Sequence, residues 1–583
     1  MSIKKIVGVF IVVVILALAS ISGYLYFNGS KIAEEILRDR IINDYNQNPE
    51  TKYLISLEKI KLNILNGSVD LINISVVPKD SLVTYKPGID QRPITNTSLV
   101  IHIGKVTLEE FDYVQALSGR TIDVKRFEIN QPQVEVFKHL GITDTTATEN
   151  QDTVDFKGVF ITHYDTFKLA EVDIINASST YYQVSEDLDT FKVLTVNHLN
   201  YQITEILITE NTMRGAPFIA YKEYNLNSEN LQVVLHNNSE INIKSFQFES
   251  ESQQLTITGA SIIPTVSPQQ FFKKQKFRKG WIKLEVEKIQ INDFDYRAWL
   301  TSNHIKIGEI QVTNPVLDVK TNSNLPFSPE DNKPMLGQLL TRIPIGYVVD
   351  KVDITGAQIN LDIIGKKSSQ HGLLSFGQMN IHANNLTNMK SHLDSSSILD
   401  IKVDTRINKM GDIKAYLAID LAHPKSATKF NVIAKNLNLK KFNSILKPIV
   451  GVEIVSGKMV SLKMSSTLNS NGGNGTLNAH YTNLKLQILA KESKKQKNFL
   501  LNVVSGLANG YIRNNSIPDQ PGYHPGKFQF TKDRTDSFFK MLWMCHLFGL
   551  EDAVIGSNKK DTRQAKKKAK EKNPKKRKKK TKK

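Results

Sequence analysis

Apolar and polar residues alternate along most of the chain between residues 50 and 490. The run KIKLNIL, residues 59–65, is one of many short examples. A period of two gives a β-strand one apolar face and one wet face. Most runs are followed by a small or turn-forming pair and then by a second run, which predicts hairpin or meander units with Pro132 and Pro315 at turns. The pattern therefore predicts a mainly β protein with few short helices.

Part of this pattern occurs twice, which favours one long sheet over separate domains. Two segments return 183 residues later: residues 102–117 (HIGKVTLEEFDYVQAL) as 285–300 (EVEKIQINDFDYRAWL), and residues 123–136 (DVKRFEINQPQVEV) as 306–319 (KIGEIQVTNPVLDV). Repeated meander units add end to end, so we expect an elongated, curved antiparallel sheet that forms a groove, with one half over residues 51–280 and a duplicated half over 281–490. The commoner alternative is a set of compact sandwiches, each closed on itself.

The N-terminus changes this picture by adding a membrane segment. Residues 6–27 are uncharged and apolar, and Lys4 and Lys5 precede them. This length crosses a hydrocarbon layer of roughly 30 Å, and the lysines place the N-terminus on the cytoplasmic side. Residues 1–27 are predicted to be a transmembrane anchor and residues 28–50 a linker helix. The alternative is a cleaved signal peptide, because Ala17-Leu18-Ala19 resembles a cleavage site.

The C-terminus is predicted to contain a helical segment, residues 491–557, and a disordered Lys-rich tail, residues 558–583. The apolar run at residues 538–550 (FFKMLWMCHLFGL) fits a core helix or a helix in a membrane interface. From residue 559 onward there are 16 Lys or Arg and 2 acidic residues. Behind an export anchor, such a tail is expected to meet anionic lipid head groups or other envelope polyanions, or only to solvate the chain. Nucleic-acid binding would require a cytoplasmic or nuclear chain.

No constellation typical of catalysis stands out. The sequence lacks a phosphate-binding P-loop, a dinucleotide-binding glycine fingerprint, an H-E-x-x-H motif and a G-x-S-x-G motif. Cys545 is the only cysteine, which excludes a CxxC zinc site and an intrachain disulfide. The carboxylates Asp293 and Asp295 are matched by Glu110 and Asp112 in the other copy, so they belong to the repeated scaffold. We therefore expect no enzyme activity, no cofactor and no metal.

The chain resembles the AsmA-like proteins of Gram-negative envelopes. The features it shares with them are a lone anchor preceded by lysines, a helix after it, and repeats of the type I-x-I-x-x-P-x-V-x-V. The Gly-rich residues 471–488 (NGGNGTLNAHYTNLKLQI) resemble the C-terminal domain of that family. Residues 527–550 (KFQFTKDRTDSFFKMLWMCHLFGL) are similar to versions found in Bacteroidetes-type bacteria. The resemblance covers nearly the whole chain, although the Lys-rich tail is not a general family feature.

This resemblance implies a single-pass inner-membrane protein with a periplasmic β-groove, linked to phospholipid transfer between membranes or to outer-membrane biogenesis. An acyl chain in water exposes many CH₂ groups at about 0.8 kcal/mol each, and an apolar trough removes most of that cost. The candidate lining residues are Phe127, Ile129, Val134 and Val136 in the first copy and Ile310, Val312, Leu317 and Val319 in the second. The alternative is that they are ordinary core residues in closed β-domains of a structural or scaffolding envelope protein.

Overall fold

The computed structural model describes residues 42–47, 53–63, 66–79, 97–111, 121–140, 166–185, 189–209, 222–235, 239–298, 304–365, 370–489, 512–520 and 523–555. The predicted anchor (1–27) and tail (558–583) lie outside these residues, as does most of the predicted linker helix, of which α3 (Asn43–Gln47) is described. Among the described helices, none has both the length and the apolar character needed to cross a membrane.

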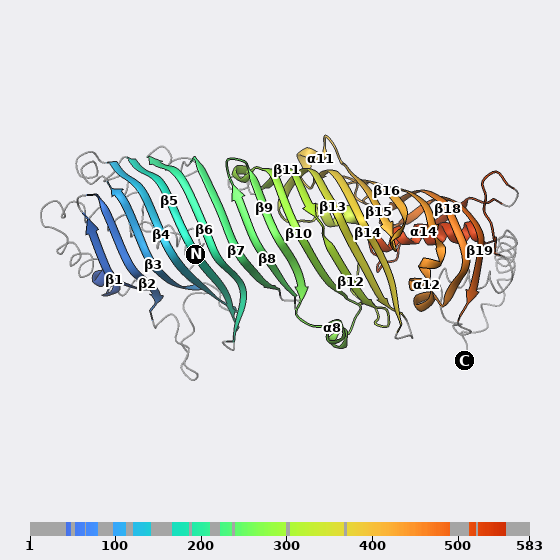
Figure 1. Ribbon diagram of the computed structural model, residues 1–583, viewed down its shortest axis with the longest axis horizontal. Coiled ribbons are helices and arrows are strands. Elements are labelled where there is room, and N and C mark those ends of the chain that lie inside the picture. Colours follow the sequence, from blue (N-terminus) through green and yellow to red (C-terminus); the bar gives the residue numbers. More distant parts are fainter. Residues whose placement is uncertain are drawn as a thin grey trace, which may run out of the picture. The chain divides into compact units, whose positions relative to one another are not determined.

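The described residues are mainly β, as predicted, with twenty strands and a few short helices (Figure 1). They divide into two compact units: unit 1 is Met1–Thr265 with Asn292–Ser302, and unit 2 is Val266–Ile291 with Asn303–Lys583. The predicted boundary after residue 280 falls at the start of β10 (Gly280–Phe294).

Unit 1 is an open series of strands. Its strands are β1 (Tyr53–Asn63), β2 (Ser68–Pro78), β3 (Thr97–Phe111), β4 (Thr121–His139), β5 (Thr166–Val184), β6 (Thr190–Thr209), β7 (Glu223–Leu235), β8 (Ser239–Glu249) and β9 (Gln254–Pro264). Each pairs with the next one antiparallel, except that β4 and β5 are parallel. In the described part of this unit the ladders join neighbours in sequence only, so the strands form an open sheet rather than a sandwich.

Unit 2 continues the same kind of series. Its further strands are β11 (His304–Thr313), β12 (Val316–Asn322), β13 (Gly346–Ile364), β14 (His371–Thr387), β15 (Ile398–Ile407), β16 (Met410–Asp420), β17 (Thr428–Asn438), β18 (Val452–Asn469), β19 (Gly472–Ile488) and β20 (Gly526–Thr531). From β13 to β20 each strand pairs antiparallel with the next. β12 also pairs antiparallel with β10, whereas both β11 and β12 run parallel to β13.

The parallel pairs correct the expectation of a purely antiparallel meander. Residues 323–345 lie between β12 and β13 and contain α10 (Leu336–Thr341). A connection of this length can return the chain to the end at which it started, so that the next strand runs in the same direction. The alternation of apolar residues is the same in parallel and antiparallel strands, which is why the pattern did not reveal the difference.

The predicted turns at Pro132 and Pro315 are wrong, because the chain continues in the same direction through a local bulge at each. β4 runs through Pro132, and the preceding Gln131 has φ 51. β11 and β12 meet at Asn314, with φ 49, before Pro315. Each bulge is a residue with positive φ after which the alternation of side chains changes phase, while the register with the paired strands is the same before and after it. Phe127 and Ile129 before the bulge therefore share a face with Val134 and Val136 after it, although the parity of their numbers differs.

The duplication is visible in the strand bounds. β3 and β10 differ by 183 residues at both ends, and β4 differs by 183 from the span of β11 and β12 together. β5 and β13 differ by 180, and their bulges match at Asn176, with φ 55, and Gly356, with φ 70. The backbone N–H of each of these donates to an asparagine of the next strand, Asn200 at 2.7 Å and Asn380 at 3.1 Å.

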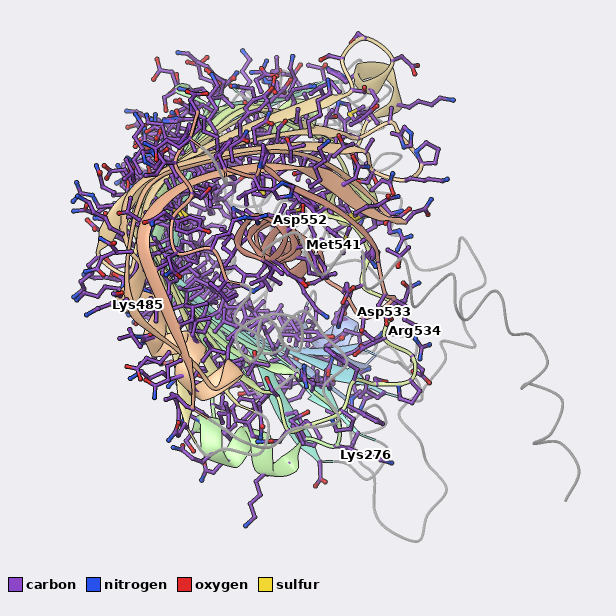
Figure 2. All side chains as sticks on the ribbon, turned by 90° about the vertical axis from the view of Figure 1, so that its right-hand side faces the viewer. Lys276, Lys485, Asp533, Arg534, Met541 and Asp552 are labelled. Carbon is purple, nitrogen blue, oxygen red and sulfur yellow. The ribbon has the colours of Figure 1, made fainter. Side chains whose placement is uncertain are left out.

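Unit 2 has a core that the sequence located only in part. The helix α14 (Phe538–Val554) lies inside the curve of the strands at the C-terminal end of the unit (Figure 2). Its buried Phe538, Met541 and Cys545 join a cluster of apolar side chains from β14 to β20. The predicted C-terminal helical segment therefore does contain a helix, but it also contains the strand β20, which pairs with β19.

Candidate functional site

The register of unit 2 places the four second-copy candidates on one face. Across the ladder between β11, β12 and β13, Ile310 lies opposite Val352, Val312 opposite Ile354, Leu317 opposite Ile359 and Val319 opposite Leu361. These β13 residues in turn lie opposite Ala383, Ile381, Phe376 and Leu374 of β14. Leu374 and Ala383 belong to the buried cluster under α14. The candidates are thus on the same side of the sheet as α14, the inner side of its curve.

On β10, β11 and β12 this face is less covered than farther along the unit. None of the four candidates belongs to the buried cluster, and all are half-buried. Ile282 of β10, opposite Val319, is 48% exposed. Among the described helices, none approaches β10, β11 or β12 as α14 approaches β18, β19 and β20. The apolar face is therefore covered by other side chains at the end where α14 packs, and it is partly exposed to solvent at β10.

The first-copy candidates occupy the equivalent face of unit 1. Phe127 and Ile129 lie opposite Leu108 and Val106 of β3. On the other side, Phe127 lies opposite Val172 of β5. Phe127, Ile129 and Val136 are buried, whereas Val134 is half-buried. The register brings all four together on one apolar face.

An aromatic group extends the apolar part of unit 1, and sequence reasoning did not identify it. Tyr224 of β7 meets Tyr296 edge to face at 4.8 Å between ring centroids, and Phe248 of β8 meets Tyr296 at 5.5 Å and Phe294 at 5.7 Å. Tyr296 is only 2% exposed. The repeated sequence FDY, which contains Phe294 and Tyr296, was the available signal. Its aromatic rings serve packing, which agrees with its role as part of the scaffold.

The opposite face carries ion pairs that fix the parallel register. In the first copy, Arg126 of β4 pairs with Asp173 of β5, at 2.8 Å between Nη2 and Oδ2, and this contact raises the pKa of Arg126. At the equivalent position of the second copy, Glu309 of β11 accepts from Lys351 of β13 at 2.7 Å, and Lys351 also pairs with Asp353. The sign of the charge on the first strand is reversed between the copies, while the pairing between the strands is kept.

A polar hollow lies around the bulges of unit 1 and was not anticipated. It is lined by Asn73, Ser75, His102, Gly104, Gln131 and Gln133, with Ile74 and Ile103 beneath. Gly104 leaves room there, whereas Glu287 stands at the matching position of the second copy and accepts from Asn314 at 2.6 Å. The lining of the hollow contains no Asp, Glu, Lys or Arg.

The helix α14 is held tightly at both ends. The Ser537 side chain accepts from the backbone N–H of Lys540 at the first turn. At the last turn, Arg513 donates to the carbonyl oxygens of Ala553 and Ile555, at 3.1 and 2.6 Å. Burial raises the pKa of the Cys545 thiol to about 12, so the thiol stays protonated and unreactive in the folded protein.

The described residues do not form a metal centre. Among them, no group of three or more His, Cys, Asp or Glu is placed to hold a metal ion. Comparison of the chain with models of known protein families found no match, and comparison with curated proteins found none either.

Proposed function

We propose that this chain binds acyl-chain lipid, such as phospholipid, along the apolar faces of its sheets. In this proposal residues 1–27 anchor it in the inner membrane, the rest of the chain is periplasmic, and the protein transfers lipid between membranes or supports outer-membrane biogenesis. The lining residues are Phe127, Ile129, Val134 and Val136 in unit 1 and Ile310, Val312, Leu317 and Val319 in unit 2. The protein acts without a reaction step.

One observation carries the proposal. The apolar face of unit 2 is continuous in register from β14 to β11 and β12, yet the buried cluster stops short of the four candidates there. A face that only served the core would be covered along its whole length. Leaving Ile282 and its neighbours partly exposed costs about 25 cal/mol for each Å² of apolar surface, unless a guest covers it. An acyl chain is a guest of suitable chemistry, because it consists of the CH₂ groups that an apolar face removes from water.

The test places a carboxylate on the apolar face. The full chain is purified from membranes, and the lipid that remains bound is quantified by mass spectrometry. Val312→Asp should reduce bound lipid at least fivefold, because an ionised carboxylate in an apolar groove is strongly disfavoured. Val312→Trp should reduce it as well, because the larger ring occupies the groove without adding a charge.

The matched control is Thr313→Asp, which puts the same group on the opposite face of the same strand. It should leave bound lipid unchanged. Circular dichroism and thermal unfolding check that all three variants are folded. If Val312→Asp and Val312→Trp are folded and carry as much bound lipid as the unmodified chain, the proposed groove is refuted.

A further inference from the structure

The helix α14 has a second apolar face that the core does not use. The helix is apolar nearly all round, as its sequence FFKMLWMCHLFGLEDAV shows. Phe538, Met541 and Cys545 point into the core and are at most 3% exposed. Phe539 is 71% exposed and Trp543 is 36% exposed, one helical turn apart on the other side. A helix that is apolar on every side normally has every side covered, so this face requires a partner.

Cationic side chains lie beside aromatic rings around this face of α14. Lys540, between the two aromatic residues in sequence, pairs with Asp536 and lies over the ring of Phe327, 6.0 Å from its centroid. Arg278 also lies over this ring, with its guanidinium carbon 4.3 Å from the centroid. Exposed aromatic rings flanked by long cationic side chains are typical of segments at the boundary between lipid head groups and acyl chains.

The residues after α14 carry the positive charge that would attract an anionic membrane surface. The helix ends at Val554, and the 16 Lys or Arg of residues 559–583 begin five residues later in the sequence. A cationic segment attracts the surface of an anionic bilayer at about 1 kcal/mol per basic residue close to the surface. Stable attachment to a membrane surface usually combines an apolar contact with such a charge. Here both elements lie next to each other in the sequence.

We infer that α14 is a membrane-docking helix, whose exposed face with Phe539 and Trp543 enters the interface of an anionic bilayer while the Lys-rich tail holds the head groups. Figure 2 shows Asp533 and Arg534, which precede the helix, on the side of the curve opposite Lys485. This inference deepens the proposed function, on which it rests, by bringing the apolar face that α14 fills next to a membrane.

The experiment uses the full chain held in phosphatidylcholine nanodiscs and mixed with separate vesicles. Flotation measures binding to vesicles of phosphatidylcholine with and without phosphatidylglycerol. The unmodified chain should bind the vesicles that contain phosphatidylglycerol. Phe539→Ser/Trp543→Ser should weaken this binding at least tenfold. Circular dichroism and thermal unfolding check that the variant is folded, because Trp543 is only 36% exposed. The matched control, Leu373→Ser/Ile433→Ser, removes exposed apolar residues that alternate with core residues on β14 and β17, and should bind as the unmodified chain does.

Three results would overturn the inference. They are equal binding with and without phosphatidylglycerol, unchanged binding of Phe539→Ser/Trp543→Ser, and binding of the unmodified chain that disappears entirely at high salt, which would assign the interaction to the tail alone. Bound lipid is measured on the same samples. A chain that carries no lipid but docks as expected would refute the groove and leave the docking helix standing.

Discussion

The packing of two glycines, one on α14 and one on the sheet, allows a direct test of how the helix is placed. Gly526 of β20 faces Gly549 of α14, and a methyl group built on Gly526 would overlap the Gly549 carbonyl oxygen. The same methyl would lie 2.9 Å from the carbonyl carbon, whereas ordinary contacts begin at 3.4 Å. Both obstacles are backbone atoms, so no side chain can move aside. In Gly526→Ala the helix must therefore retreat by more than about 0.5 Å, which is the displacement that the carbonyl carbon alone requires.

The expected cost follows from that displacement. A gap of about 0.5–1 Å forfeits a quarter to a half of the dispersion energy between the facing surfaces, and overpacking of a core typically costs about 1–3 kcal/mol. We take about 2 kcal/mol, which corresponds to roughly a 30-fold increase in the population in which α14 is detached. Cys545 reports this population, because its buried, protonated thiol reacts only when the helix opens.

The assay is the rate at which a thiol reagent modifies Cys545 in the full chain under native conditions. Gly526→Ala should increase this rate about 30-fold. Gly377→Ala is the matched control, because a methyl group there meets no heavy atom within 4 Å, and its rate should not change. If Gly526→Ala protects Cys545 as well as the unmodified chain does, the close packing of α14 on β20 is wrong.

Two further predictions concern charge. Arg126→Ala should destabilise unit 1 by about 1–3 kcal/mol in urea unfolding, because it removes the cation beside Asp173, whose side chain is only 9% exposed and would be left with the hydrogen bond from Gln202. Arg406→Ala, which breaks an exposed pair with Asp412, should cost at most about 1 kcal/mol. Equal costs would contradict the role given to Arg126. Acidification should loosen α14, because desolvation lowers the pKa of His546, next to the ring of Phe430, below its ordinary 6.5. The folded state then binds fewer protons than the unfolded state, so this contribution is present above pH 6.5 and is lost as the pH falls below it. His546→Gln should show less of this loss, measured as Cys545 reactivity on either side of pH 6.5, and an unchanged pH dependence would exclude His546 as its source.

The alternation of residues was enough to predict a mainly β chain, the repeated unit and the face on which the candidate residues lie. It failed at the bulges, because Gln131-Pro132 and Asn314-Pro315 have the composition of a turn, and a bulge and a turn both use a residue with positive φ. It also failed at β20, whose pairing with β19 depends on contacts far apart in sequence. The helix α14 was recognised from its apolar run, but its exposed face could be assigned only when the buried side was known.

The bulges explain how one face can stay apolar over strands of this length. Without them, a strand with the sequence of β4 would turn Val134 and Val136 to the side opposite Phe127 and Ile129. The two copies agree on the position of this bulge and on the apolar residues beside it, yet they reverse the charge at Arg126 and Glu309 on the other face. A scaffold that recognised its partner through the polar face would need the same charges in both copies. What the copies share is a continuous apolar face, which is the property that a lipid-binding groove requires.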